Sequence, residues 1–484
     1  MKPILFTFLL SFLYFQISQA QWQPDLRLTN DPGLSFTTSY NNARCIASSG
    51  DTVHVVWYDN RSGGNYEIYY KRSTDGGISW GADTRLTNNV YYSSDPSISV
   101  SGSVVHVVWD DQRDGNDEIY YKRSTDGGTI WGSDTRLTND SSLSRNPCVT
   151  ASGSVVFVVW NDYNTLDIFY KCSTDGGISW GVDTQLTNDP GPSWYPAVSV
   201  SGSIVHVAWE EGRGGNANIY YKRSSDGGIN WGLDTPLTNN DTTIYFGSPS
   251  LSISGSVVHV VWTDTRDHGM NYGVYYKSST DGGISWNQET HITNNIAISY
   301  APSVSVSGSG VHVVWYVNRD GNFEIYYNHS TDEGISWGID TRLTNNSAYS
   351  AKPFVSVSGS VVHVVWMDLR DGNYEIYYKR NPTGNATGIE NSNSEIPKEF
   401  LLEQNYPNPF NPSTIIQYTI VSRKFVSLKI YDVLGNEIAT LVNEEKPTGS
   451  YEVNFNSSQL SSGIYFYKLQ AGSFVETKKM MLLK

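Results

Sequence analysis

The order of apolar and polar residues between positions 96 and 138 predicts four short β-strands in a row. Pro96 to Ser101 alternates apolar with small polar residues, and Val104 to Trp109 is a β-branched run that is apolar on both faces. Glu118 to Lys122 is rich in aromatic residues, and Thr135 to Thr138 is short and followed by Asn139. A strand that is apolar on both faces must be covered on both sides, so we expect this sheet to pack between two others.

The same pattern recurs along most of the chain. A Ser-x-Asp-x-Gly-x-x-Trp motif occurs six times, with its aspartates at intervals of 51, 49, 51, 55 and 51 residues. An apolar run that ends in tryptophan occurs seven times, at Trp57, Trp109, Trp160, Trp209, Trp262, Trp315 and Trp366. A fixed period of this length indicates a solenoid or a propeller, and four strands in each repeat favour propeller blades.

Counting strands predicts how the ring of repeats closes. The seventh repeat stops at Lys379-Arg380 without a fourth strand, whereas Leu26 to Asn30, before the first repeat, matches Thr135 to Asn139. Pairing between this N-terminal strand and the last repeat removes an exposed sheet edge. We therefore predict an all-β fold: a seven-bladed β-propeller closed by the N-terminal strand, followed by a small immunoglobulin-like β-sandwich.

The two ends of the chain differ from the repeats in their composition and sequence pattern. Residues 1–20 combine a lysine, a short apolar run and Ser18-Gln19-Ala20, the pattern of a removable secretory signal peptide. Residues 21–380 hold the repeats, and residues 381–400 have the polar, Pro- and Gly-containing composition of a solvated linker. Residues 401–484 read as alternating strands broken by Pro and Gly turns, which predicts the β-sandwich.

Composition and charge narrow the classes of function. Charged residues make up 17% of the chain and aromatic residues 13%, which excludes disordered and coiled-coil chains. The net charge of -15 repels a phosphate backbone, so no nucleic acid partner is expected. The three cysteines lack the spacing of a zinc site. Six repeats have a histidine in their second strand, but with one histidine in each sheet these side chains are too far apart to bind one metal ion together. We predict no cofactor and no metal.

The six Ser-x-Asp-x-Gly-x-x-Trp motifs resemble the Asp box, or BNR repeat, of sialidases and related propellers. The aspartate can bond backbone N–H groups of its own turn, glycine permits positive φ, and tryptophan fills the space between sheets. The resemblance implies that the turn joins the third and fourth strands on the face opposite the active site. We therefore predict a structural role for Asp75, Asp126, Asp175, Asp226, Asp281 and Asp332, and for Trp80, Trp131, Trp180, Trp231, Trp286 and Trp337.

The C-terminal residues resemble a second family. Gln404 to Pro412, Val426 to Asp432 and Ser462 to Tyr467, with the closing Lys478 to Lys484 segment, are similar to the C-terminal sorting domain (type A) of proteins exported by the type IX secretion system of Bacteroidetes-like bacteria. The resemblance implies that residues 401–484 engage the secretion machinery. It also implies that the protein is secreted or lies on the outer cell surface of a Gram-negative bacterium.

Two sets of loop residues are candidate ligand contacts. An arginine follows the second strand in six repeats and forms either a loop salt bridge or a pocket for sugar hydroxyls or carboxylates; these are Arg61, Arg113, Arg213, Arg266, Arg319 and Arg370. Aromatic residues occupy the connections between repeats, where they either bind carbohydrate or pack over the channel. They include Tyr92, Trp194, Tyr195, Tyr245, Tyr300 and Tyr349.

The resemblance to sialidases raises the question of catalysis. The arginine triad of that family begins in an aromatic-Arg-Ile-Pro motif, whereas this chain has Ala43-Arg44-Cys45-Ile46, and no second or third arginine can be matched. Near-identical repeats present one residue at several separated places, which favours multivalent binding. Our leading hypothesis is a secreted, monomeric, noncatalytic propeller that binds a polysaccharide or a surface glycoprotein. The alternative is a sialidase-like glycoside hydrolase or a polysaccharide lyase that uses Arg44, Asp95 and Tyr349.

Overall fold

The structure is a computed structural model that describes residues 22–38, 44–213, 217–239, 246–266, 272–293, 297–384, 400–402, 404–405, 408–421, 424–446, 449–458 and 460–483. The predicted signal peptide and most of the predicted linker lie outside these residues. The chain divides into two compact units, Met1–Gly388 and Ile389–Lys484, and each is described by itself. Within the described residues, no helix is long and apolar enough to cross a membrane.

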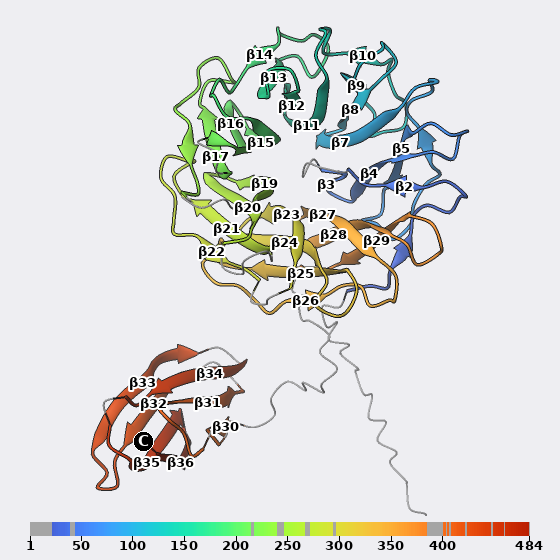
Figure 1. Ribbon diagram of the computed structural model, residues 1–484. Coiled ribbons are helices and arrows are strands. Elements are labelled where there is room, and N and C mark those ends of the chain that lie inside the picture. The colour runs from blue at the N-terminus through green and yellow to red at the C-terminus, as the bar shows by residue number, and fades with distance from the viewer. Residues whose placement is uncertain are drawn as a thin grey trace, which may run out of the picture. The chain divides into compact units, whose positions relative to one another are not determined.

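The described residues of the first unit form seven β-sheets, which Figure 1 shows arranged around a common centre. The first sheet contains β2 (Ser35–Phe36), β3 (Ile46–Ser49), β4 (Thr52–Asp59), β5 (Glu67–Ser73) and β6 (Thr84–Arg85). Its two short strands β2 and β3 both pair with β4, where each of the other sheets has one strand. The second and third sheets contain β7 (Ser93–Ser101), β8 (Val104–Asp111), β9 (Glu118–Ser124), β10 (Thr135–Arg136), β11 (Ser144–Ser152), β12 (Val155–Asp162), β13 (Asp167–Ser173) and β14 (Thr184–Gln185).

The remaining sheets follow the same antiparallel order. The fourth and fifth contain β15 (Ser193–Ser201), β16 (Ile204–Glu211), β17 (Asn218–Ser224), β18 (Thr235–Pro236), β19 (Phe246–Ser254), β20 (Val257–Asp264), β21 (Gly273–Ser279) and β22 (Thr290–His291). The sixth contains β23 (Ser299–Ser307), β24 (Gly310–Val317), β25 (Glu324–Ser330) and β26 (Thr341–Arg342). The seventh contains β27 (Ser350–Ser358), β28 (Val361–Asp368), β29 (Glu375–Asn381) and β1 (Leu26–Arg27).

The seventh sheet takes its outer strand from the other end of the chain. β1 pairs antiparallel with β29, with Leu26 opposite Tyr378 and Arg27 opposite Tyr377. Leu28 N donates a hydrogen bond to Ile376 O at 2.8 Å. The N-terminal segment therefore occupies the place of a fourth strand, and β29 itself ends at Asn381, the first residue of the predicted linker.

Hydrophobic cores lie between neighbouring sheets. Between the first and second sheets, Ile68 and Leu86 pack together with Ile98, Val107 and Trp109. The tryptophans two residues before the ends of the seven second strands are almost completely buried. This burial between two neighbouring sheets explains why the second strands are apolar on both faces.

The turn between the third and fourth strands is held by its aspartate. Asp75 accepts hydrogen bonds from the backbone N–H groups of Ile78 and Ser79 and from Ser73 Oγ, at 2.7 to 3.1 Å. Bonds from Ser79, together with those from Ser73 and Ile78, lower the pKa of Asp75 below its usual value. These contacts give the aspartate a structural part in the turn.

Each motif also contacts the preceding sheet. The Trp80 ring lies edge-on to Tyr378 of the seventh sheet at 4.9 Å between centroids, and the other five motif tryptophans meet a tyrosine in the same way. Gly77 has a φ of +83°, and a Cβ there would collide with the Tyr378 hydroxyl. Glycine is therefore required both by the backbone conformation and by the neighbouring sheet.

Trp22 takes the place of the motif tryptophan that the seventh repeat lacks. Its ring lies edge-on to Tyr327 at 5.0 Å, and it is 7% exposed. Gln23 N donates to Arg380 O, just as Gly81 N donates to Arg72 O in the first sheet. The sequence analysis matched this segment only from Leu26 onward and so did not identify Trp22 as a core residue.

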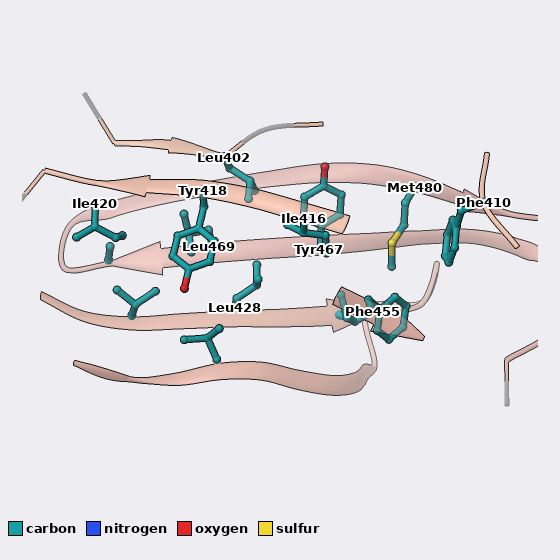
Figure 2. Packing of buried hydrophobic residues seen from close by; sticks show 14 of the residues in the cluster. Leu402, Phe410, Ile416, Tyr418, Ile420, Leu428, Phe455, Tyr467, Leu469 and Met480 are labelled. Carbon is teal, nitrogen blue, oxygen red and sulfur yellow. The ribbon is translucent and has the colours of Figure 1, made fainter. Parts of the chain in front are cut away.

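The second unit consists of two antiparallel sheets that share a hydrophobic core (Figure 2). One sheet contains β30 (Leu401–Leu402), β31 (Ser413–Ile420) and β34 (Gly449–Asn456). The other contains β33 (Glu437–Lys446), β32 (Lys424–Tyr431), β35 (Gly463–Ala471) and β36 (Phe474–Leu482). Phe410, in the Asn- and Pro-rich segment, forms a parallel bridge with Leu482 and packs into this core. Within the described residues, the predictions of an all-β fold and of four-stranded sheets in the repeats are confirmed, except that the first sheet contains five strands.

Candidate functional site

One end of the first unit's sheets carries most of the irregular chain. Because consecutive strands are antiparallel, the connection from second to third strand and the connection to the next sheet lie at the same end, which we call the loop face. β7 reaches this end at Ser93, beyond its predicted start at Pro96, and a bulge lies between Ser94 and Ser97. Asp95 in the bulge has a φ of +48°. The equivalent residues of four other sheets, Asn146, Tyr195, Ala301 and Lys352, also have positive φ, so the bulge is a repeated feature of the loop face.

Aromatic side chains form a continuous row across the loop face, from the fifth sheet through the sixth, seventh and first to the second. Neighbouring ring centroids are 4.9 to 6.4 Å apart. We call this row the aromatic arc; in spatial order it contains Tyr272, Tyr300, Tyr316, Phe323, Tyr349, Tyr374, Phe36, Tyr58, Tyr66 and Tyr92. Most of these rings are partly exposed.

A groove of about 600 Å³ lies at the Tyr92 end of the arc. Its walls are rich in amides and phenols, which come from Asn65, Asn88, Asn89, Gln112, Tyr91 and Tyr92. Asn65 Nδ2 donates to Asn89 O at 2.7 Å and to Tyr91 O at 3.1 Å, so it ties two walls of the groove together. Tyr91 is 51% exposed and Tyr92 45%. The groove thus offers mostly neutral hydrogen-bonding groups beside accessible aromatic faces; the one charged side chain among the described residues that line it, Arg85, is paired with Glu67 at 2.8 Å.

A smaller cavity of about 180 Å³ adjoins the groove, and Gln112 lines both. Its wall contains the carboxylates of Asp95, Asp110 and Asp117 together with Arg145. Arg145 Nε donates to Asp117 Oδ2 at 2.6 Å. Within the cavity wall, this ion pair balances one of the three carboxylates.

Asp110 is the carboxylate of this cavity whose pKa is raised well above its usual value. Its side chain accepts a hydrogen bond from Ser94 Oγ at 2.9 Å through Oδ2, and its residue is 4% exposed. Burial, and then the Asp95 and Asp117 carboxylates, raise the pKa of Asp110 well above its usual value. Within the described residues, no group of three or more His, Cys, Asp or Glu side chains is arranged to hold a metal ion.

The six predicted loop arginines are held by their own sheets. Arg113 donates to Asp134 at 2.7 Å and to Asp111 at 2.6 Å, and its guanidinium carbon lies 4.2 Å from the centre of the Tyr120 ring. The same combination of a carboxylate and a stacked tyrosine is found at Arg61, Arg213, Arg266, Arg319 and Arg370. This geometry favours the salt-bridge alternative, and ligand contact by these arginines stays a prediction.

The three candidate catalytic residues lie in different surroundings. Arg44, on the first sheet, donates through Nη2 to Leu251 O on β19 of the fifth sheet at 2.8 Å. Burial lowers the pKa of the Arg44 guanidinium. Asp95 lines the small cavity, whereas Tyr349 lies within the aromatic arc.

The predicted loop aromatics divide between the arc and the cavity. Tyr92 and Tyr300 belong to the arc. Trp194 packs against Tyr163, which lines the cavity, at 5.0 Å, and against Tyr195 at 6.4 Å. Tyr245 lies outside the described residues.

The sequence analysis missed several residues of this face. In the arc these are Tyr58, Tyr66, Tyr272, Tyr316, Phe323 and Tyr374, and in the cavity they are Asp110, Asp117 and Arg145. For all of these except Arg145, which lies on β11, the signal is a departure from repetition at matched positions, directly after the second-strand tryptophan or directly before the third strand. The loop face is therefore not uniform around the ring, in contrast to the expected repetition of one contact in every blade.

Comparison with known families identifies the C-terminal residues. Residues 404–483 match the secretion system C-terminal sorting domain. This domain marks proteins that the type IX secretion system exports to the cell surface or the extracellular space, and the predicted export of this protein is confirmed. The sequence matches no curated protein.

Solved structures resemble the chain at low sequence identity. Polysaccharide lyase Uly1 is similar with a TM-score of 0.52 and 10% identity, over 75% of this chain and 99% of the lyase. A mutant Trypanosoma rangeli sialidase with trans-sialidase activity has a TM-score of 0.46 and 12% identity, over 96% of this chain and 90% of its own. The Hadza microbial sialidase Hz136 has a TM-score of 0.43 and 14% identity, over 68% and 73%. The likeness to the lyase concerns the fold alone.

Proposed function

We propose that the exported protein is a noncatalytic binding protein that holds a polysaccharide or a surface glycoprotein on its loop face. Its scaffold is a seven-bladed propeller that the N-terminal strand closes. A rigid ring suits this task, because loops held by a rigid scaffold lose little conformational freedom when a ligand binds.

The aromatic arc is the observation that carries the proposal. Ten rings in contact form a long surface of partly exposed aromatic faces, and Tyr92 at one end is 45% exposed. The apolar faces of sugar rings can stack on such a surface, while the phenol hydroxyls can bond to sugar hydroxyls. A row that extends over several sheets matches a chain of sugars better than a single small molecule.

The groove at the end of the arc supports the same class of ligand. Its amides offer donors and acceptors in fixed positions, because Asn65 bonds to Asn89 and Tyr91. Neutral hydrogen-bonding groups beside aromatic faces recognise hydroxyl-rich molecules without requiring charge.

An enzyme is the second candidate, and the small cavity is the observation that favours it. Asp95 and Asp110 line one cavity, and the raised pKa of Asp110 suits a proton donor. Under this alternative the protein is a glycoside hydrolase or a polysaccharide lyase.

Binding and turnover measured on the same preparation separate the two candidates. We expect the full-length chain to bind glycans on an array and to leave sialosides and polysaccharides uncleaved. Tyr92→Ala should weaken array binding by about tenfold, because it removes an exposed ring from the arc. Cleavage that Asp110→Asn abolishes would establish the enzyme and reject the noncatalytic proposal.

A further inference from the structure

The small cavity occupies a place that aromatic residues fill in the first sheet. Phe36 pairs with Tyr58 there, and Tyr66 directly precedes β5. The matching residues of the second sheet are smaller or charged: Ser94 pairs with Asp110, and Asp117 directly precedes β9. Three bulky rings are thus replaced by a serine and two aspartates, which leaves an acidic cavity in an otherwise aromatic surface.

One carboxylate oxygen in this cavity has no hydrogen-bond partner among the residues that the structure describes. This atom is Asp110 Oδ1, which is fully buried in a residue that is only 4% exposed. The other oxygen, Oδ2, accepts a hydrogen bond from Ser94. A buried acceptor without a donor costs free energy, and a buried charge more so. The site is therefore arranged to gain from a donor that enters the cavity.

The charged groups around Asp110 favour a positive donor. The Asp95 and Asp117 carboxylates act on Asp110, and Arg145 opposes them, but Arg145 already pairs with Asp117. Lys352, on the seventh sheet, also interacts electrostatically with Asp95. The cavity wall itself carries three carboxylates and one guanidinium, which leaves an excess of negative charge.

We infer that this cavity binds a primary ammonium group, so that the ligand is a polysaccharide with free amino groups. The inference rests on the proposed function and names the class of ligand. An ammonium group has three donors, which suits a cavity lined by several carboxylates. Gln112 lines both spaces, so a sugar in the groove can place an amino substituent in the cavity.

Two matched oligosaccharides test the inference. Calorimetric titration of the full-length chain compares glucosamine hexamer with N-acetylglucosamine hexamer at about pH 6, where an amino group carries its proton. We expect the glucosamine hexamer to bind at least about tenfold more tightly, since an unpaired buried carboxylate gains a charged donor.

Asp110→Asn should remove this preference, because it lowers the affinity for the glucosamine hexamer to about that for the acetylated hexamer. Asparagine already occupies the equivalent position in β12, as Asn161, so the variant suits the fold. Asp51→Asn removes an equal charge from an exposed hairpin and serves as the control, which should keep the preference.

The outcomes separate the inference from the function on which it rests. Equal affinity of the native chain for the two hexamers, or a preference that survives Asp110→Asn, would overturn the ammonium site while leaving glycan binding intact. Loss of the preference in Asp51→Asn would show that the preference depends on the overall charge of the protein, and would also overturn the ammonium site. Binding of neither hexamer, together with an array free of signal, would contradict the proposed function as well.

Discussion

At the scale of single residues, the repeated histidines serve the packing between strands. His106 shares a hydrogen bond of 2.8 Å between Nδ1 and the Tyr121 hydroxyl, and the same contact occurs at His54, His206, His259, His312 and His363. In the third sheet Phe157 takes this position and stacks on Tyr170, whose hydroxyl donates to Gly228 O. Histidine and phenylalanine therefore both pack against the third-strand tyrosine at this position.

These buried histidines should make stability depend on pH. Burial, with a smaller effect from Arg123, lowers the pKa of His106 from 6.5 to about 4. The unfolded chain takes up a proton below about pH 6.5 and the folded chain does not, so stability falls as pH drops from there toward about 4. For His106 this shift corresponds to a loss on the order of 3 kcal/mol over this window.

His106→Phe isolates one of these contributions. We expect the melting temperature of the variant to fall less between pH 7 and pH 4 than that of the native chain, because phenylalanine cannot take up a proton. Thermal unfolding across this range measures the difference. A constant gap between the two melting curves at every pH would show that His106 does not carry this dependence.

At the scale of elements, the N-terminal segment completes the last sheet. It supplies a strand that pairs with β29 and a tryptophan that packs against Tyr327. Arg370 in the last sheet also donates to Asp25 in this segment at 2.7 Å, as Arg113 donates to Asp134 within the second sheet. The segment therefore reproduces the contacts of a fourth strand in full.

Trp22→Ala should lower the free energy of unfolding by about 3 to 5 kcal/mol, the usual cost of removing a large buried aromatic side chain. Trp194→Ala is the matched control, because Trp194 is the other tryptophan outside the repeated positions and is only partly buried. Denaturant titration should show the larger loss for Trp22. Equal losses in both variants would contradict the role of the N-terminal segment in holding the last sheet.

The strands could be predicted well because their sequence signals are local. The β-branched runs such as Val104 to Trp109 and the regular spacing of the motifs define each sheet without reference to the rest of the chain. Trp22 could also have been predicted, because Trp22, Asp25 and the residues from Arg27 to Asn30 match the segment from Trp80 to Asn88 at the same spacing. The bulge at Asp95 was missed because positive φ in an aspartate has no clear sequence signal.

At the scale of the whole molecule, repetition in the strands coexists with differences on the loop face. The position after the second-strand tryptophan holds Tyr58 in the first sheet, Asp110 in the second and Tyr316 in the sixth. Residues far apart in the sequence then meet, as where Tyr374 contacts Phe36. This is why the candidate site could be predicted only in part, through Tyr92, Tyr300 and Tyr349, whereas the continuous arc required the arrangement of the sheets.

Hydrogen exchange of the full-length chain, with and without a bound oligosaccharide selected from the array, tests most directly whether the loop face holds the ligand. We expect slower exchange in the groove segments 62–66 and 88–93 and near Tyr349, and unchanged exchange in the turns of the Ser-x-Asp-x-Gly-x-x-Trp motifs, such as residues 75–80. Protection confined to those turns, or bound ligand that leaves the loop face unprotected, would contradict the account.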